Sequence, residues 1–437
     1  MLSAKKYALV LGGGGAKGAY QIGAWKALKE QNIHFSAVIG TSIGGLNGAF
    51  LAQDDYNSIY KIWNGISIDK IVALPGELIK NGEFKLNRHN LKHLKKVQDN
   101  FLHNRGLDTT PLKKMIDKYL QEDKIRKSGI DFGIVTYELN NLKPIEYFLE
   151  DIPAGQLGYY LLGSASLPGF KATKFKNKVL IDGGVHNNLP YALAKERGYK
   201  KIIVIDISGF GRSKKPETEG TETIYIKNTG DLGGTIDFRP RVVKQNMEMG
   251  YLDTLKIFQK ISGINYYYHK EKKIIKALEK ILFEAKVINE YKKYLKDNNT
   301  ASSIESRIRE QLPQGKAKYK FIIPALAECA AESLDLERVK LYRFMDFIQR
   351  IRERRMEIKR DGMAENIKSQ PFEYFIKSIK EGETIYKLPP YQYNLILDFV
   401  FGRGDDKVFY TRALSGLFPE LIPAKIFFII LNHYHRR

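Results

Sequence analysis

The sequence is poor in cysteine and contains no long hydrophobic run. Its one cysteine, Cys329, excludes a framework of internal disulfides and a zinc site built on cysteines. Such a composition is typical of a reducing compartment. No stretch approaches the roughly 18 apolar residues of a membrane-spanning helix. Lys5 and Lys6 precede only a short apolar run, which does not fit a secretory signal peptide.

Acidic residues are in deficit, with 49 Asp and Glu against 71 Lys and Arg, so the net charge is +22. The excess is spread evenly, because residues 1–250 hold 36 basic and 25 acidic side chains and the remainder holds 35 and 24. A diffuse positive field attracts anionic lipid surfaces by about 1 kcal/mol per basic residue near the headgroups. It also attracts nucleic acid, and solvated lysine-rich faces account for it equally well. We expect a cytoplasmic protein that associates peripherally with an anionic membrane surface, with no nucleic-acid partner.

Metal-binding patterns are also scarce. Nothing matches the spaced acids and glycine of a calcium loop. His89 and His93 have a metal-capable spacing, but no third ligand follows, so a solvated helix face is the favoured interpretation. We expect no metal and no cofactor.

The segment Gly40-Thr41-Ser42-Ile43-Gly44 is the strongest chemical signal that is present. It lies between an apolar strand and a helix. Glycine neighbours allow a serine to occupy a sharp strand-to-helix turn, which exposes its hydroxyl at the positive end of the helix. The pentapeptide also arises by chance in glycine-rich chains, so it needs support from other segments.

The first support is upstream, where the apolar run Tyr7–Leu11 leads into a glycine block, Gly12–Gly18. Successive glycines after a strand let backbone amides converge on one point and bind an anion. An acyl-transfer serine needs such donors, because the carbonyl oxygen becomes negative in the tetrahedral intermediate.

The same block permits a dinucleotide-binding alternative, since Gly13-x-Gly15-x-x-Gly18 is a literal G-x-G-x-x-G. That alternative expects a carboxylate at the end of the second strand. Here the strand Ala37–Ile39 is followed by the serine turn instead. A P-loop is excluded more firmly, because no Gly-Lys-Ser/Thr follows.

The second support is downstream, where the strand Val179–Ile181 ends in Asp182-Gly183-Gly184. Open α/β sheets place their sites at the carboxyl ends of strands. Asp before Gly is most often only a turn former. Three strand-end motifs at one edge of one sheet favour a functional carboxylate.

Together, Gly13–Gly18, Gly40–Gly44 and Asp182–Gly184 resemble the signature blocks of the patatin-like phospholipases. Ser164–Phe170 is similar to the serine-rich block of that family, and Asn188-Leu189-Pro190 resembles its Asn-x-Pro. The resemblance covers roughly residues 5–210 and gives nothing for the last half of the chain.

The resemblance implies a three-layer α/β sandwich with a central, mostly parallel sheet, and a hydrolase that cleaves carboxylic esters of membrane lipids. It implies Ser42 as the nucleophile and Asp182 as its base. The implied oxyanion hole consists of the amides of Gly13, Gly14 and Gly15. The supporting motif positions are Lys17, Gly18, Gly40, Gly44, Gly183 and Gly184. Lys17 stands where the family usually has Arg, and we expect it to fix the loop or meet phosphate.

A histidine base is unsupported by the sequence. An α/β-hydrolase triad runs Ser, acid, His in chain order. His186 lies on the same turn as Asp182, His269 lies in the C-terminal part, and His433 and His435 belong to a tail that we expect to be solvated. A third hypothesis remains open, a membrane-attached protein whose hydrolase site is vestigial.

Four lysines, Lys171, Lys174, Lys176 and Lys178, lie in a predicted hairpin that leads into Asp182. We expect them at the mouth of the cleft, facing lipid headgroups.

The predicted domains are an acyl hydrolase over residues 1–250 and a mainly helical domain over 251–437. Within the first, residues 54–125 are expected to form a helical cover, and 76–106 a mobile part of it. In the second, the apolar run Ile426–Leu431 is expected to be buried.

Overall fold

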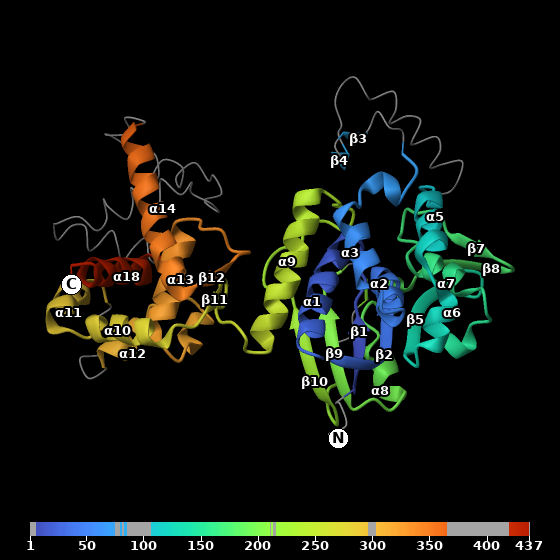
Figure 1. The fold of residues 1–437 in the computed structure, drawn as a ribbon, viewed down its shortest axis with the longest axis horizontal. Coiled ribbons are helices and arrows are strands. Elements are labelled where there is room, and N and C mark those ends of the chain that lie inside the picture. Colours follow the sequence, from blue (N-terminus) through green and yellow to red (C-terminus); the bar gives the residue numbers. More distant parts are fainter. Residues whose placement is uncertain are drawn as a thin grey trace. The chain divides into compact units, whose positions relative to one another are not determined.

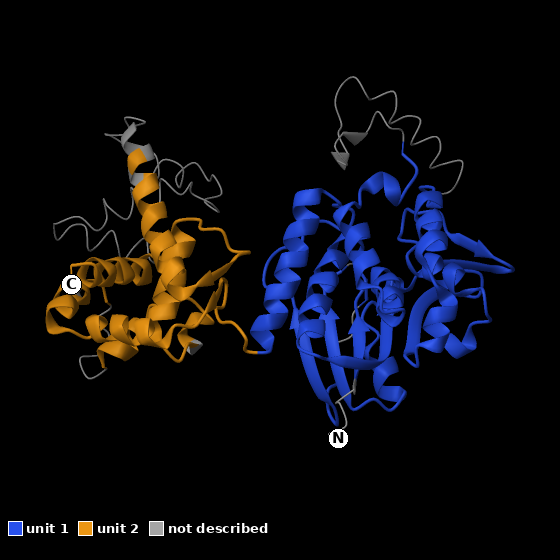
Figure 2. Ribbon diagram, in the orientation of Figure 1, with its two compact units in different colours: residues 1–258 blue, residues 259–437 orange. Residues whose placement is uncertain are grey.

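The structure is a computed structural model. It describes residues 6–74, 79–80, 83–84, 106–209, 211–212, 216–295, 303–364 and 419–436. The chain divides into two compact units, residues 1–258 and 259–437 (Figure 2). Each unit is considered by itself.

The first unit is built on an eight-stranded mixed sheet with the order β10-β9-β1-β2-β5-β8-β7, in which β6 also pairs with β5 (Figure 1). Its strands are β1 (Lys6–Leu11), β2 (His34–Thr41), β5 (Asp131–Glu138), β6 (Lys143–Phe148), β7 (Thr173–Phe175), β8 (Lys178–Asp182), β9 (Lys201–Asp206) and β10 (Glu222–Lys227). The five strands from β10 to β5 are parallel, whereas β6 and β8 run antiparallel to β5. The central strands are apolar throughout because helices cover both faces of the sheet.

The helices of this unit are α1 (Ala19–Glu30), α2 (Ile43–Ala52), α3 (Tyr56–Asn64), α5 (Thr110–Tyr119), α6 (Glu122–Lys127), α7 (Leu157–Ser164), α8 (Tyr191–Glu196) and α9 (Pro240–Ile257). On one face, Tyr191 and Leu193 of α8 share a buried cluster with Val10 and Ile39. On the other, Gly48 of α2 faces Val38. The predicted three-layer α/β sandwich with a mostly parallel sheet is confirmed.

Single turns of 3-10 helix occur at η1 (Gly15–Gly18), η2 (Ile68–Lys70), η5 (Leu149–Asp151) and η6 (Gly183–Val185). Helices α3 and α5 and the first part of α6 fall within the predicted cover, residues 54–125. Of residues 76–106, the structure describes Gly106 and a short antiparallel pair, β3 (Ile79–Lys80) with β4 (Glu83–Phe84). The rest of this segment, with His89, His93 and His103, lies outside the described residues.

The second unit is mainly helical, as predicted. It contains α10 (Lys272–Leu282), α11 (Ala285–Tyr291), η7 (Lys292–Tyr294), α12 (Ile304–Glu310), η8 (Lys316–Lys318), α13 (Ile322–Ser333), α14 (Phe344–Ala364), α18 (Leu421–Tyr434) and the parallel pair β11 (Tyr267–His269) and β12 (Leu341–Arg343). The run Ile426–Leu431 is buried within it. The expectation of a solvated tail is wrong for His433, which lies in the last turn of α18 and contacts Glu290 at 2.7 Å with its side chain 13% exposed. No helix among the described residues is long and apolar enough to cross a membrane.

Helix α9 packs closely against α1, and this contact places the division of the chain at Phe258 instead of residue 250. Two glycines allow the approach. A Cβ at Gly23 would lie 1.7 Å from the carbonyl oxygen of Met247, and one at Gly250 would lie 1.9 Å from that of Tyr20. Neither helix can accept a larger residue there without moving.

We therefore expect Gly23→Ala to destabilise the first unit. Overpacking costs about 1–3 kcal/mol, and here the clash is with backbone, so the loss in unfolding free energy should reach at least that range. Urea unfolding measures it. Gly158→Ala is the control, because a Cβ there would lie 3.5 Å from Ile116 Cγ2, an ordinary contact. Replacing Gly158 of α7 by alanine should raise the unfolding free energy by about 0.5–1 kcal/mol. Equal effects of the two substitutions would contradict the packing interpretation.

Candidate active site

Ser42 occupies the turn between β2 and α2. Its backbone has φ 57° and ψ −126°, a conformation that residues other than glycine rarely adopt. The turn is tight because glycines flank it. A Cβ at Gly40 would lie 2.4 Å from the carbonyl of Gly44, and one at Gly44 would lie 2.3 Å from the carbonyl oxygen of Leu11. A strained backbone at a serine is a feature of functional sites.

The end of β8 brings Asp182 to this turn. Strand β5 pairs with β2 as far as Val135 and with β8 from Thr136, so the carboxyl ends of β2 and β8 meet along consecutive residues of β5. As a result, Ser42 Oγ donates a hydrogen bond of 2.6 Å to Asp182 Oδ2. Both side chains are buried, each about 3% exposed. The hydroxyl and the carboxylate lie in contact although they are far apart in the chain.

The environment of Asp182 makes its carboxylate more basic than usual. Burial raises the pKa of Asp182 from 3.8 to about 6, while hydrogen bonds from Ser42 and from the Gly184 amide oppose that rise. The Gly184 amide donates to Oδ1 at 2.7 Å. A Cβ at Gly183 would lie 2.3 Å from the carbonyl oxygen of Val135, so the Asp-Gly-Gly turn needs its first glycine to lie against β5.

Ser164 also takes part in the site, a contact that sequence reasoning did not identify. The Ser42 amide donates to Ser164 Oγ at 2.8 Å, and that hydroxyl donates to the carbonyl oxygen of Val135 at 2.5 Å. Ser166 accepts a hydrogen bond from the Asp182 amide through its carbonyl oxygen. The serine-rich block was a signal for this role, but spacing alone does not say which backbone groups it would bind.

The glycine block lies beside Ser42, since a Cβ at Gly13 would be 3.0 Å from Ser42 Cβ. The Gly13 amide is already used, because it donates to the carbonyl oxygen of Asn188 at 3.1 Å. The amides of Gly14 and Gly15 donate to no oxygen among the residues that the structure describes. Of the three predicted oxyanion donors, the Gly13 amide is thus occupied, and a role for the other two stays a prediction.

Contacts from distant segments hold the block in place. Ala16 donates its amide to the carbonyl oxygen of Thr235 at 2.7 Å. Lys17 Nζ donates to the carbonyl oxygen of Ser208 at 3.0 Å, which fixes the loop after β9. A Cβ at Gly18 would lie 2.4 Å from Ile43 Cγ1, so the block packs directly on the first turn of α2.

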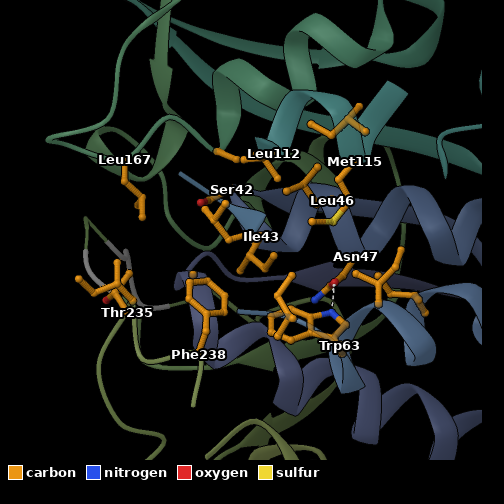
Figure 3. A pocket seen from close by; sticks show the side chains of 18 of the residues that line it. Ser42, Ile43, Leu46, Asn47, Trp63, Leu112, Met115, Leu167, Thr235 and Phe238 are labelled. Atoms are coloured by element: carbon orange, nitrogen blue, oxygen red, sulfur yellow. Dashed lines mark hydrogen bonds between the residues drawn. The ribbon is translucent and has the colours of Figure 1, made fainter. Parts of the chain in front are cut away.

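An apolar pocket adjoins Ser42 (Figure 3). Leu112 and Met115 of α5 lie across it from Trp63 and Phe238. The volume within it that the centre of a water molecule can occupy is about 70 Å³. Asn47, the pocket's buried amide, is satisfied by partners within the protein: its Oδ1 accepts from Trp63 Nε1 at 3.1 Å, and its Nδ2 donates to Gln21 Oε1 at 2.8 Å. The pocket is therefore a dry surface suited to a hydrocarbon chain.

The predicted lysine hairpin forms, but its lysines do not share one surface. In the β7–β8 register Lys178 stands opposite Phe175, and Lys174 stands opposite Val179. Lys174 shares a face of the hairpin with Val179, which stands opposite it. Val179 is the neighbour of Lys178 in β8, and neighbouring positions of a strand face opposite sides, so Lys178 lies on the other face from Lys174. Lys178 lies 3.9 Å from Glu138 and over the rings of two tyrosines. Lys171, Lys174 and Lys176 line no part of the apolar pocket. That the four lysines face lipid headgroups stays a prediction.

His186, the histidine nearest to Asp182 in the chain, does not contact Ser42 through a hydrogen bond among the described residues. His186 lies 3.8 Å from Glu146, and among the described residues the carboxylate of Asp182 is the side chain that hydrogen-bonds Ser42 Oγ. No group of three potential metal ligands occurs in the part of the chain that the structure describes.

The raised pKa of Asp182 predicts how stability depends on pH. Because the folded protein binds this proton more tightly than the unfolded chain does, ionisation of Asp182 lowers stability as the pH rises from 3.8 through about 6. Asp182→Asn removes that titration. Relative to the variant, the wild type should lose up to about 3 kcal/mol of unfolding free energy between about pH 4 and about pH 8. Denaturant melts of both proteins at the two pH values measure this difference, and a pH-independent difference would contradict it.

Comparisons with known proteins agree on the first unit. The family model of the patatin-like phospholipases matches residues 9–195. Lysophospholipase NTE1 of Kluyveromyces lactis is 30% identical over 212 residues, which is 47% of this chain and 13% of that protein. Human patatin-like phospholipase domain-containing protein 6 is 28% identical over 211 residues, 47% of this chain and 14% of that protein.

The chain thus matches only a small part of these relatives. Among solved structures, VipD from Legionella pneumophila aligns over 98% of this chain and 91% of that chain, with 14% identity and a TM-score of 0.36. The sequence match and the observed sheet lead to one conclusion: the chain contains a patatin-like phospholipase domain at residues 9–195.

Proposed function

We propose that the protein is a serine lipid acyl hydrolase that cleaves carboxylic esters of membrane lipids through Ser42 and Asp182. The observation that carries this proposal is the 2.6 Å hydrogen bond between the two buried side chains, of which Ser42 also lines the apolar pocket. The family match of residues 9–195 supports it.

In the proposed reaction, Ser42 Oγ attacks the ester carbonyl carbon and its proton moves to Asp182 Oδ2. The carbonyl oxygen becomes an oxyanion near the amides of Gly14 and Gly15. Collapse of the intermediate breaks the ester bond, and the leaving alcohol takes the proton from Asp182. Water then repeats the sequence on the acyl-enzyme, so that the fatty acid leaves and Ser42 is restored.

The pKa of Asp182 suits the role of base. At neutral pH a carboxyl group with a pKa of about 6 is mostly ionised, so it can accept a proton. It is also more basic than an exposed aspartate, which favours proton transfer from the serine. The raised pKa of Asp182 supports a mechanism in which the serine and the aspartate act without a histidine.

The apolar pocket supports a lipid as the substrate. A chain of methylene groups gains about 0.8 kcal/mol for each group that it buries. Relatives named as lysophospholipase and patatin-like phospholipase are consistent with a phospholipid or lysophospholipid as the source of that chain. The net charge of +22 favours an anionic membrane as the place where the substrate is met.

Two other functions remain less supported. A dinucleotide-binding protein needs a carboxylate at the end of β2, where Ser42 stands. A vestigial site would not need to preserve a strained serine in contact with a buried carboxylate.

Ser42→Ala should abolish covalent labelling by a fluorophosphonate probe, because the probe reacts with an activated serine. The same change should abolish fatty-acid release from a mixed phospholipid panel followed by lipid mass spectrometry. Removal of a catalytic nucleophile generally costs several orders of magnitude in rate. Labelling that persists in the variant, or a wild type that neither labels nor turns over lipid, would reject the hydrolase proposal.

Asp182→Asn should remove nearly all esterase activity, since a general base contributes about 10²–10⁴-fold and an amide cannot replace it. His186→Ala is the matched control from the same turn, and it should retain most of the activity. Initial rates on a soluble short-chain ester compare the two variants. Full activity in Asp182→Asn would end the Ser–Asp proposal, whereas a large loss in His186→Ala would point to a histidine base.

A further inference from the structure

The segment 228–239, between β10 and α9, completes the apolar pocket although it lies beyond the residues that match the family model. Thr235, Ile236 and Phe238 line the pocket from this side. Figure 3 shows Thr235 on the same side of the pocket as Ser42 and Leu167. One wall of the proposed acyl site therefore belongs to this protein's own connection between sheet and helix.

The start of the segment is anchored in the core of the unit, and its far end carries an ion pair within the segment itself. Asp253 of α9, which is 1% exposed, accepts hydrogen bonds from the Thr229 amide at 3.0 Å and the Thr229 hydroxyl at 2.8 Å. Asn246 Nδ2 donates to the carbonyl oxygen of Leu232 at 2.9 Å. At the far end, the guanidinium of Arg239 donates to both carboxylate oxygens of Asp237.

The middle of the segment is joined to the catalytic loop. The carbonyl oxygen of Thr235 accepts the Ala16 amide at 2.7 Å, directly after Gly14 and Gly15 in the glycine block. Phe238 is buried and stacks on Trp63, with ring centroids 6.4 Å apart. The segment is thus held in one position relative to the site by contacts before and after Ile236.

Ile236 differs from its neighbours because it lines the pocket and is also 59% exposed to solvent. Phe238, two positions away, is only 6% exposed. An exposed isoleucine has no structural benefit in water, where its side chain loses the transfer free energy that burial would give. Its continuity with the dry pocket means that an acyl chain which enters past Ile236 stays in contact with apolar surface.

We propose that segment 228–239 is the entrance rim of the active site and that Ile236 inserts into the lipid surface that holds the substrate. The inference rests on the proposed function, because it takes the pocket as the site of the acyl chain. The chosen occupant is a lipid–water interface, since a chain leaving a bilayer must exchange one apolar environment for another. The net charge of +22 would bring the protein to an anionic surface, and Ile236 would then contact the hydrocarbon region.

The test compares Ile236→Asp with Leu142→Asp. Leu142 is also exposed, at 70%, but it lies in the turn between β5 and β6 and does not line the pocket. Each variant is assayed on anionic phospholipid vesicles and on a soluble short-chain ester. For Ile236→Asp, the vesicle rate should fall about 10-fold more than the soluble-ester rate, as expected from the loss of one inserted isoleucine. Leu142→Asp should change neither rate, and Ile236→Leu should restore the vesicle rate.

A second measurement separates this inference from the proposed function. Flotation with the same vesicles is repeated in a Ser42→Ala background, so that binding is followed without hydrolysis. Weaker flotation of the Ile236→Asp form, but not of the Leu142→Asp form, supports the rim even if no lipid turnover is found in the wild type. Equal loss in both rate assays, or flotation that is unchanged by Ile236→Asp, would overturn it.

Discussion

The hydrogen bond from the Ser42 hydroxyl to the Asp182 carboxylate joins residues 140 positions apart, and it exists because β2 and β8 end against consecutive residues of β5. Two strands that approach from opposite directions along one neighbour leave no space between their ends. The contact removes the carboxylate from water, which raises its pKa, and aims it at a single hydroxyl. Basicity and direction therefore have the same structural origin.

Close backbone approach is the second constraint. The glycine block, the serine turn and the Asp-Gly-Gly turn all lie where a Cβ would meet a carbonyl group or a neighbouring side chain. This crowding also explains which amides are already bonded. The Gly13 amide donates to Asn188 and the Ala16 amide to Thr235, whereas the amides between them, of Gly14 and Gly15, have no backbone acceptor among the described residues. The site is organised by backbone contacts before any substrate arrives.

The pocket adds a third level, because it is assembled from segments that share no local pattern. Helices α2, α3 and α5 supply half of the lining residues, and segment 228–239 supplies three more. The polar groups at its edge, Asn47 and Trp63, bond to each other and leave hydrocarbon facing the cavity. A hydrophobic pocket beside the Ser42–Asp182 pair is the combination that an ester of a long-chain acid requires.

The sequence by itself determined the α/β class, the order of the strand-end motifs and the identity of the serine and the aspartate that meet, because apolar runs and glycine spacing are local properties. It did not give the side of the hairpin on which Lys178 lies, because that depends on strand register, and it misjudged His433, which contacts Glu290 of a neighbouring helix. Ser164, the occupied Gly13 amide and the wall from segment 228–239 were decided only by the tertiary structure. Each of these depends on which residue, far away in the chain, supplies a hydrogen-bond partner or a packing surface. The spacing of residues along the sequence does not show which of them come into contact.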